Sequence, residues 1–259
     1  MVCISRNEAN IKRQRVRELL DLQPKIEEAT TIIKMAFDKI VNPVVAFSGG
    51  KDSLVVLDLV RRVKPDVIGV FENTTNEYPE TLNFVKTIPN IIELRPDISF
   101  EECFKRYGLP VMKSKAKSHG NQCCIKLKEE PFRKYAKTNN VTLTFTGLTS
   151  DESRNRMMML KRMGALYFHK SDQLWKCHPI YNWSNHHVWQ YIDFRKLLYN
   201  PIYDKLGRTA RCGCRFCTAY LSWKERTSQY NEKDTHILTR KQGYKLLSDF
   251  NTHEPIASV

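Results

Sequence analysis

The sequence lacks any apolar run that approaches the ~18 residues needed to span a membrane. Its N-terminal stretch, MVCISRNEANIKRQR, also lacks the apolar segment of a secretory signal peptide. No internal repeat and no low-complexity segment is present. These absences argue against a membrane protein and a repeat array. We therefore expect a cytoplasmic protein without a membrane partner, built as one large α/β domain or as one domain with an added segment.

Acidic residues are too few to balance the basic ones. The chain has 42 Lys and Arg against 28 Asp and Glu, which gives a formal net charge of +14. Residues 112–128 and 154–163 concentrate the excess. Clustered Lys and Arg neutralise phosphates and release counterions, so DNA or tRNA is one expected partner. The alternative is that the charge serves only solubility.

Segments with strand and helix patterns alternate after Pro43. Short apolar runs bounded by turn residues predict strands, and longer runs with helical spacing predict helices. The predicted strands cover residues 43–47, 66–72, 91–96 and 141–148. The predicted helices begin at about residue 52 and cover 79–88, 99–108 and 127–140. This alternation predicts an α/β fold, in which a parallel twisted sheet has helices on both faces.

Three parts are expected along the chain. Residues 1–40 form an N-terminal helical arm, with the helical pattern itself over 8–40. Residues 41–175 form the nucleotide-binding α/β domain. Residues 176–259, where Trp, Tyr, Pro and Cys accumulate and the pattern becomes irregular, form a C-terminal portion packed on the carboxyl edge of the sheet.

The segment FSGGKDS, residues 47–53, connects the first predicted strand to a helix that should begin near Asp52 or Ser53. Gly49 and Gly50 can adopt positive φ and bring backbone N–H groups close to an anion. The helix adds the positive end of its dipole. The pattern is not the Walker motif, which requires GxxxxGK[ST]. The residues expected to hold phosphate are Ser48, Gly49, Gly50, Lys51, Asp52 and Ser53.

The loop resembles the pyrophosphate loop of the N-type ATP pyrophosphatases, which cleave ATP between the α- and β-phosphates. Further segments resemble the family of reductases for adenosine 5′-phosphosulfate (APS) and 3′-phosphoadenosine 5′-phosphosulfate (PAPS) within that superfamily. These segments are ENTTNEYPET (72–81), GLTSDESRNR (147–156), PIYNW (179–183), VWQYI (188–192) and NPIYD (200–204). Asn73 and Thr75 depart from the family pattern, which has Asp and Gly there. The resemblance spans about residues 43–220 and implies the Rossmann-like fold of the adenine nucleotide alpha hydrolases.

The family motifs fall at predicted strand ends, which line the crevice at the carboxyl edge of a parallel sheet. Arg154 and Arg156 are predicted to grip phosphate or sulfate through their planar guanidinium groups. The alternative for both is an ordinary surface arginine. Trp183 and Trp189 are expected in the core. The other residues placed near the nucleotide by the resemblance are Glu72, Asn73, Thr74 and Gly147.

Eight cysteines are present, and in a cytoplasmic protein clustered cysteines indicate metal or redox chemistry rather than structural disulfides. Cys123 and Cys124 are adjacent, and Cys214 and Cys217 have the spacing of a chelating pair. Spacing alone leaves zinc, a redox dithiol and an iron–sulfur cluster open. Cys3, Cys103 and Cys177 are isolated in the sequence, so we interpret them as structural.

The resemblance favours iron–sulfur chemistry. CCIKLKEEPF is similar to the family's CCxxLKxxP, and GCRFCT to its GCxxCT. The pattern implies a [4Fe–4S] cluster, and Lys128 is expected to approach the nucleotide or the cluster. Cys212 is left over as a sulfur carrier or a buried thiol. The implied ligands are Cys123, Cys124, Cys214 and Cys217.

Two features argue for ATP chemistry rather than sulfonucleotide reduction. Reductases of the family carry a catalytic cysteine in an ECGxH-like segment near the C-terminus, whereas the last cysteine here is Cys217. Their loop is also degraded, whereas SGGKDS is complete here. The preferred hypothesis is an ATP pyrophosphatase that adenylates an acceptor for sulfur transfer, in DNA phosphorothioation or tRNA thiolation. Lys51 and the loop amides would stabilise the departing phosphates, with Mg²⁺ held near Asp52.

Sulfur would come from a donor such as a cysteine desulfurase. The first alternative is an APS or PAPS reductase that produces sulfite, with Cys212 or a partner's thiol in place of the missing tail cysteine. The second alternative is a non-catalytic, nucleotide-binding redox sensor. The sequence leaves open whether the chain works as a homodimer.

Overall fold

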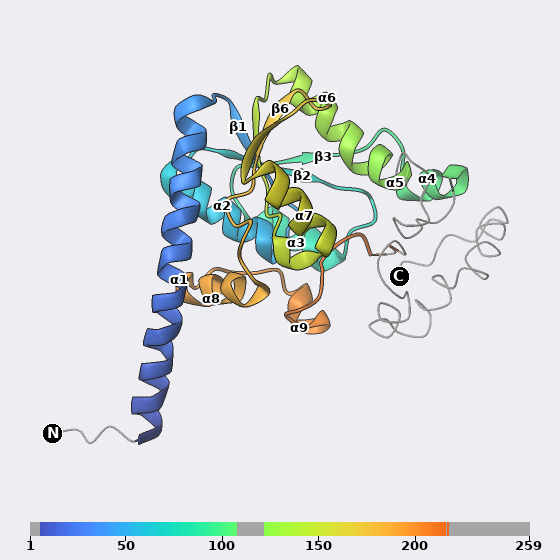
Figure 1. Ribbon diagram of the computed structural model, residues 1–259. Coiled ribbons are helices and arrows are strands. Elements are labelled where there is room, and N and C mark those ends of the chain that lie inside the picture. The colour runs from blue at the N-terminus through green and yellow to red at the C-terminus, as the bar shows by residue number, and fades with distance from the viewer. Residues whose placement is uncertain (1–5, 108–121, 216, 218–259) are drawn as a thin grey trace.

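The computed structural model describes residues 6–107, 122–215 and 217, and its centre is a six-stranded sheet (Figure 1). The order of the strands across the sheet is β3-β2-β1-β4-β6-β5. The strands are β1 Pro43–Ala46, β2 Ile68–Glu72, β3 Ile91–Leu94, β4 Leu143–Phe145, β5 Leu166–His169 and β6 Leu174–Cys177.

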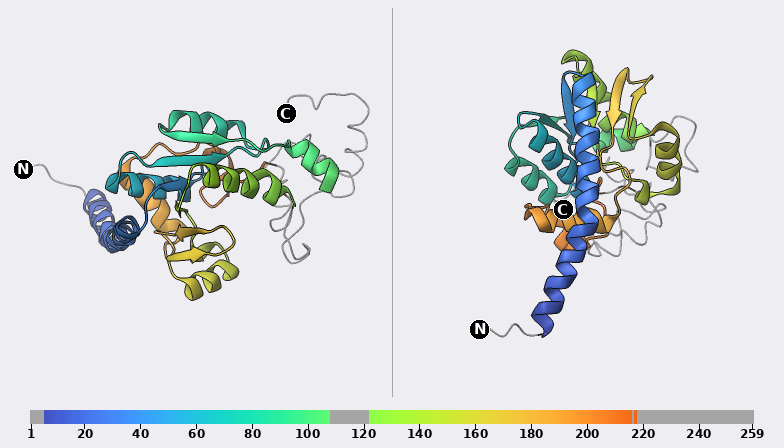
Figure 2. Two further views of the ribbon diagram at one scale, coloured as in Figure 1. Left: turned by 90° about the horizontal axis from the view of Figure 1, so that it is seen from above. Right: turned by 60° about the vertical axis from the view of Figure 1, so that its left-hand side comes forward.

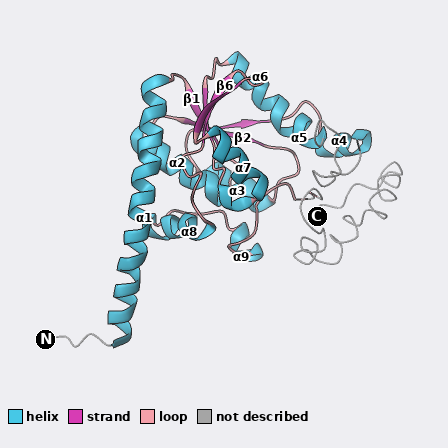
Figure 3. Ribbon diagram, in the orientation of Figure 1, coloured by secondary structure: helices cyan, strands magenta, loops and turns pink. Residues whose placement is uncertain are grey.

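Helices follow most of the strands, as the sequence predicted (Figure 3). A π-helix, Ile125–Glu129, continues α5, and a 3₁₀-helix, Ser150–Glu152, precedes α7. The α-helices are α1 Arg6–Lys39, α2 Lys51–Val63, α3 Pro79–Thr87, α4 Phe100–Tyr107, α5 Gln122–Cys124, α6 Glu130–Thr138, α7 Arg154–Met163, α8 Asn185–Arg195 and α9 Ile202–Leu206.

The four predicted strands are confirmed as β1 to β4, and they are parallel to one another. β1 lies between β2 and β4, so the order in which the chain adds strands to the sheet reverses there, and ligands of open α/β sheets bind at the carboxyl end of such a switch point. β6 extends the parallel sheet beside β4, whereas β5 pairs with β6 in the antiparallel direction. The sheet is therefore mixed and mostly parallel, and the predicted α/β class is confirmed.

The two faces of the sheet are covered by different helices. Successive side chains of a strand point to opposite faces. Val44 belongs to a small apolar cluster against which Phe132 and Tyr135 of α6 pack. Val45 belongs to the main core, which the apolar sides of α1, α2 and α8 also form. The central strands β1, β2 and β4 are thus buried on both faces, which is why their sequences are nearly continuous apolar runs, whereas β3 and β5 at the two edges are partly exposed.

The predicted N-terminal arm is confirmed as the long helix α1. Its C-terminal half buries Leu22, Ala29, Ile33 and Ala36, which recur at helical spacing, against the main core. Its N-terminal half extends past the rest of the molecule (Figures 1 and 2). None of the helices in the described residues is long and apolar enough to cross a membrane.

The predicted boundary between residues 175 and 176 falls inside β6. Beyond it, the buried residues of α8 and α9 belong to the same core as the sheet. Trp183 and Trp189 are buried in that core, as expected. Residues 218–259 and most of the basic segment 112–128 lie outside the described residues, as does Cys3.

Candidate functional site

The glycine loop lies at the carboxyl end of β1, where the order in which the chain adds strands to the sheet reverses. Gly49 has a φ of +72°, and a Cβ there would lie 2.8 Å from Thr81 Cγ2, so both conformation and space require glycine. Ser53 fixes the loop: its hydroxyl accepts from Ser48 N at 3.2 Å and donates to Gly50 O at 2.9 Å. α2 begins at Lys51, one residue before the predicted start, so its first amides adjoin the loop.

Asn200 holds the loop from a distant part of the chain. Its fully buried amide nitrogen donates to Gly49 O at 3.1 Å and to Thr81 Oγ1 at 2.8 Å. Its amide oxygen accepts from Ile202 N at 3.1 Å. The NPIYD segment therefore has a physical role: it fixes the carbonyl of the glycine at positive φ.

Tyr203 and Cys212 complete the wall of the loop. The hydroxyl of Tyr203 accepts from Lys51 N at 3.0 Å and donates to Cys212 Sγ at 3.3 Å. A Cβ on Gly50 would lie 2.6 Å from the same sulfur, so only glycine allows this approach. Burial raises the pKa of the Cys212 thiol to about 11, although the hydrogen bond from Tyr203 opposes the shift. Sequence analysis did not identify Tyr203, whose only signal was its place in NPIYD.

Lys51 and Asp52, the two predicted catalytic residues in the loop, form an ion pair. Lys51 Nζ lies 2.6 Å from Asp52 Oδ2, and the lysine is only 8% exposed. A buried ammonium at the first turn of a helix adds to the positive potential of the loop. The ammonium of Lys51 can therefore attract an anion while the carboxylate of Asp52 keeps the ammonium in place.

Gly147 joins the site as predicted, and the reason is close packing. A Cβ on Gly147 would lie 2.6 Å from the carbonyl carbon of Asp52 and 2.7 Å from Ser53 N. The segment after β4 thus lies directly on the first turn of α2. Without a side chain at residue 147, the two backbones can approach this closely.

Arg154 and Arg156 lie at the start of α7. Arg156 forms an ion pair with Glu152, and Arg211 Nη2 lies 3.3 Å from another oxygen of the same carboxylate. Arg154 is exposed. The structure thus gives Arg156 an intramolecular carboxylate partner, and the predicted anion grip by either arginine stays a prediction.

The end of β2 carries polar residues that are engaged within the protein. Asn73 donates to Glu93 Oε1 at 2.9 Å and accepts from Thr75 N at 2.9 Å. Thr74 donates to Glu77 Oε1 at 2.7 Å. Asn73, which replaces the family's Asp, therefore holds β2 to β3 and shapes the turn after it.

A half-buried group of charges lies beside this turn. Burial raises the pKa of Glu72 to about 7, while Lys128 lowers it and Glu77 raises it. Burial disfavours the charge on Lys128, but Cys214, Glu77 and Glu72 together raise its pKa. Lys128 thus stays charged among acidic groups, next to one of the predicted cluster ligands.

The two predicted cysteine pairs approach each other. Cys123 is hydrogen-bonded to Cys124, and Cys217 also acts on it electrostatically, so the pKa of Cys123 is raised. Thr74 Oγ1 lies 3.7 Å from Cys214 Sγ, and Arg215 N donates to Asn76 O at 2.7 Å, which ties the second pair to the end of β2. Cys103 is buried, as expected, and it interacts with Cys124.

These sulfurs fit an iron–sulfur cluster in the number and kind of donors, with Lys128 available to offset thiolate charge. In the described part of the chain, however, no three His, Cys, Asp or Glu side chains are arranged closely enough to hold a single metal ion. The [4Fe–4S] assignment therefore stays a prediction. The contacts among the cysteines are compatible with it.

His178 supports the segment before Gly147 and gives a pH prediction. Its Nδ1 lies 2.6 Å from Thr146 Oγ1, and burial, with help from Lys176 and Arg156, lowers its pKa from 6.5 to about 4. A lowered folded-state pKa means that the unfolded chain binds the proton more tightly. Between about pH 6.5 and 4 the protein should lose about 3 kcal/mol of unfolding free energy from this group.

The measurement is urea unfolding at several pH values. His178→Gln should flatten the dependence between pH 6.5 and 4, whereas His186→Gln, at an exposed position, should leave it unchanged. An equally steep dependence in His178→Gln would show that His178 titrates normally in the folded protein.

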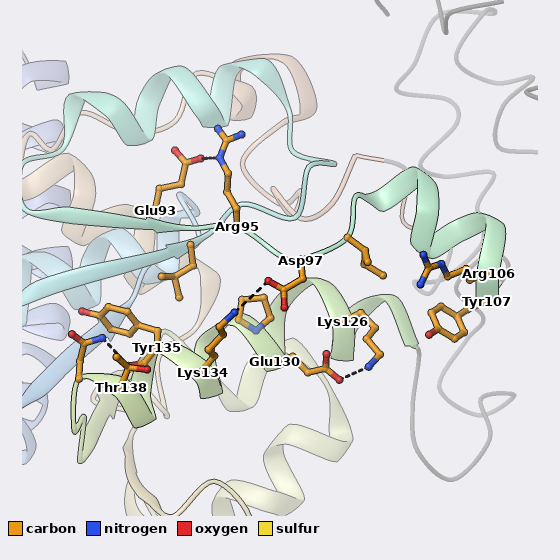
Figure 4. Close-up of a pocket in the computed structure, with 14 residues that line it drawn as sticks. Glu93, Arg95, Asp97, Arg106, Tyr107, Lys126, Glu130, Lys134, Tyr135 and Thr138 are labelled. Atoms are coloured by element: carbon orange, nitrogen blue, oxygen red, sulfur yellow. Dashed lines mark hydrogen bonds and ion pairs between the residues drawn. The ribbon is translucent and has the colours of Figure 1, made fainter. Parts of the chain in front are cut away.

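A cavity of about 700 Å³ lies elsewhere, between the end of β3, α4 and α6 (Figure 4). Charged side chains in its lining are paired: Lys126 Nζ lies 2.6 Å from Glu130 Oε1, and Lys134 Nζ lies 3.4 Å from Asp97 Oδ1. None of the predicted site residues lines it. The candidate site is therefore the loop at the end of β1, not this cavity.

Solved structures contain the same fold. The crystal structure of PAPS reductase from Candida auris, a phosphate complex, matches with a TM-score of 0.54 at 21% sequence identity. The match covers 78% of this chain and 93% of that one. It confirms the expected adenine nucleotide alpha hydrolase-like fold.

Comparison with protein sequences identifies the family to which the chain belongs. The chain is 36% identical over 200 residues to uncharacterized protein MJ0066 of Methanocaldococcus jannaschii. The aligned region covers 74% of this chain but only 39% of the length of that protein. The chain is also 28% identical over 181 residues to adenosine 5′-phosphosulfate reductase 2 of Bacillus subtilis. That aligned region covers 68% of this chain and 72% of the enzyme. A model of the phosphoadenosine phosphosulfate reductase domain matches residues 42–220. This match extends from β1 through the phosphate loop to the second cysteine pair, and the chain therefore belongs to the phosphoadenosine phosphosulfate reductase domain family.

Proposed function

We propose that this protein reduces a sulfonucleotide, APS or PAPS, to sulfite and the corresponding adenosine phosphate, with electrons from a dithiol. The observation that carries the proposal is the position of Cys212 and Cys214 on the edge that holds the phosphate loop. Cys212 lies against Gly50, and Cys214 contacts Thr74. A thiol can react with the sulfur of a bound sulfonucleotide only if it lies close to the loop that holds the phosphate. The APS reductases among the relatives support this choice over the adenylating enzyme preferred from sequence.

The loop would bind the phosphosulfate end of the substrate. The amides around Gly49 and Gly50 and the dipole of α2 favour an anion at this position. Lys51 would stabilise the charge that develops on the phosphate as the bond to sulfur breaks, and Asp52 orients its ammonium group. Arg156 would have to give up its ion pair with Glu152 before it could bind the substrate.

The proposed [4Fe–4S] cluster would be held by Cys123, Cys124, Cys214 and Cys217. When bound, it would connect the two cysteine segments and so hold the second one against the end of β2. Lys128, which interacts electrostatically with Cys214, Glu72 and Glu77, would offset part of the negative charge of the thiolates.

The test is an anaerobic assay of sulfite release from APS and from PAPS, with dithiothreitol or thioredoxin as the reductant. Sulfite and the adenosine phosphate should appear in equal amounts. Iron analysis and the visible spectrum of the same sample test the cluster separately. If neither sulfonucleotide yields sulfite with an iron-loaded protein, the reductase proposal fails.

A second candidate keeps the adenylating reaction predicted from sequence. The observation that favours it is the complete loop, in which Lys51 and Asp52 are both present and paired. In this reaction an acceptor oxygen would attack the α-phosphorus of ATP, pyrophosphate would leave, and sulfur would then displace AMP. Asp52 is the residue that would hold Mg²⁺, which would offset the charge of the phosphates. The basic composition favours DNA or tRNA as the acceptor.

Pyrophosphate release from ATP and Mg²⁺ distinguishes the two candidates. Mobility-shift assays with tRNA and duplex DNA at several salt concentrations test the acceptor, because binding through phosphates weakens steeply as salt rises. Pyrophosphate release without sulfite formation would favour the adenylating enzyme. Binding of ATP with neither product would favour the redox sensor.

A further inference from the structure

We infer that Cys212 is the thiol that attacks the sulfur of the bound sulfonucleotide, an inference that rests on the proposed reductase function. The sulfur of Cys212 lies against the loop that would hold the phosphosulfate anion. A Cβ on Gly50 would be only 2.6 Å from Cys212 Sγ, so the sulfur adjoins the loop backbone itself. An anion bound by the amides of this loop would therefore lie next to this thiol.

Tyr203 positions the thiol. Its ring is 4% exposed and packs edge-on against Trp189, with centroids 5.2 Å apart and planes at 88°. Its hydroxyl joins Lys51 N to Cys212 Sγ through two hydrogen bonds. Because the hydroxyl accepts from one of the loop amides, a phosphate oxygen that takes this amide would displace it. Substrate binding and release of the thiol would thus be coupled through one side chain.

The other described cysteines have different surroundings. Cys177 is buried in β6, where its backbone pairs with Leu166 and Phe145. Cys123 interacts with Cys124, Cys217 and Cys103, and these residues form the cysteine group next to α4 and α5. The geometry of the loop therefore distinguishes Cys212 from the cysteines assigned to the core or to the cluster.

The reaction balances with a dithiol as the reductant. The sulfur of Cys212 bonds to the sulfonate sulfur, the bond from that sulfur to the phosphate oxygen breaks, and the thiol proton goes to the departing phosphate. The enzyme then carries Cys212–S–SO₃⁻. A thiolate of the dithiol attacks Sγ of Cys212 and sulfite leaves with the electron pair. The second thiol of the reductant resolves the mixed disulfide, so two electrons pass from the dithiol to the sulfonate sulfur.

Trapping the intermediate tests the inference. The iron-loaded full chain is incubated with APS or PAPS without reductant, and its peptides are analysed by mass spectrometry. The expected result is one SO₃ adduct, located on Cys212. Cys212→Ser should form no adduct and lose sulfite release by about 10³-fold, as expected when a nucleophile is removed. It should still bind AMP and retain its iron, and Cys177→Ala should behave like the wild type in all these measurements.

The outcomes separate the inference from the proposed function. If wild type releases sulfite and Cys212→Ser does so equally well, or if the adduct lies on another cysteine, the inference is overturned and the reductase function stands. If wild type forms neither sulfite nor adduct, the proposed function fails and the inference with it.

Tyr203→Phe tests positioning while keeping the ring packed on Trp189. Its single-turnover rate of adduct formation should fall about 10-fold at saturating substrate, whereas its KM should fall, because the phosphate no longer has to displace the hydroxyl from the amide of Lys51. An unchanged rate of adduct formation would show that the hydroxyl is only structural.

Discussion

Lys51→Ala is expected to lose about 10²- to 10³-fold in kcat for sulfite release, with little change in the fold. The ammonium of Lys51 lies in the first turn of α2, next to the loop, and is nearly buried. It would act mainly on charge that develops as the bond to sulfur breaks, so its loss affects kcat more than substrate binding. Removing it leaves Asp52, whose carboxylate is 22% exposed and can be hydrated.

The measurement is steady-state sulfite release, accompanied by thermal unfolding of each variant. Lys51→Arg should recover part of the activity because it retains the charge, though not the geometry. Lys137→Ala, on the exposed side of α6, serves as the matched control and should resemble the wild type. Full activity in Lys51→Ala would mean that the ammonium of Lys51 does not stabilise the departing phosphate, and it would contradict the role given to Lys51 in both candidate reactions.

The central strands could be predicted because burial on both faces gives them continuous apolar runs. PVVA and IGVFE carry such runs, and turn residues bound them. The β5–β6 pair had no comparable signal. Its strands have four residues each and contain half-buried polar side chains, and the connecting turn places Gln173, rather than glycine or asparagine, at a φ of +53°. A left-handed glutamine is a conformation that local sequence does not predict.

The phosphate loop was also predictable, since its glycines, hydroxyls and charges are contiguous in the sequence. What surrounds it was not. Asn200, Tyr203 and Cys212 reach the loop from about 150 positions away, and their contacts follow from how α9 packs on the end of the sheet. Sequence analysis therefore gave Cys212 no definite role. It likewise could not show that Asn73 is engaged with Glu93, because that contact depends on how β2 and β3 pair.

Gly147→Ala is expected to destabilise the protein by about 3 kcal/mol and to abolish nucleotide binding at the loop. The added methyl group would lie 2.6 to 2.8 Å from three backbone atoms of Asp52 and Ser53. Backbone in the first turn of a helix cannot move aside as a flexible side chain can. The segment after β4 and the start of α2 must therefore separate, and the amides next to Lys51 would shift with them.

Gly164→Ala is the matched control because it isolates the cost of backbone conformation. Gly164 has a φ of +77° and a ψ of −177°, with no atom within 4 Å of an added Cβ, so this variant should lose about 1 to 3 kcal/mol from strain alone and keep its affinity for AMP. Urea unfolding and AMP binding by calorimetry measure both effects. Equal affinity of the two variants for AMP would show that the backbones at residues 147 and 52 are not in tight contact.

The two loop variants should fail in different ways, and the difference tests how the site works. Lys51→Ala removes charge without moving the backbone, so it should still bind AMP while turnover falls. Gly147→Ala moves the backbone but keeps every charged group, so it should abolish the binding of AMP and of the sulfonucleotide alike. If Gly147→Ala instead bound AMP normally and lost only turnover, the amides of the loop would contribute nothing to nucleotide affinity. Binding would then depend on the polar residues at the end of β2, among them Glu72 and Thr74.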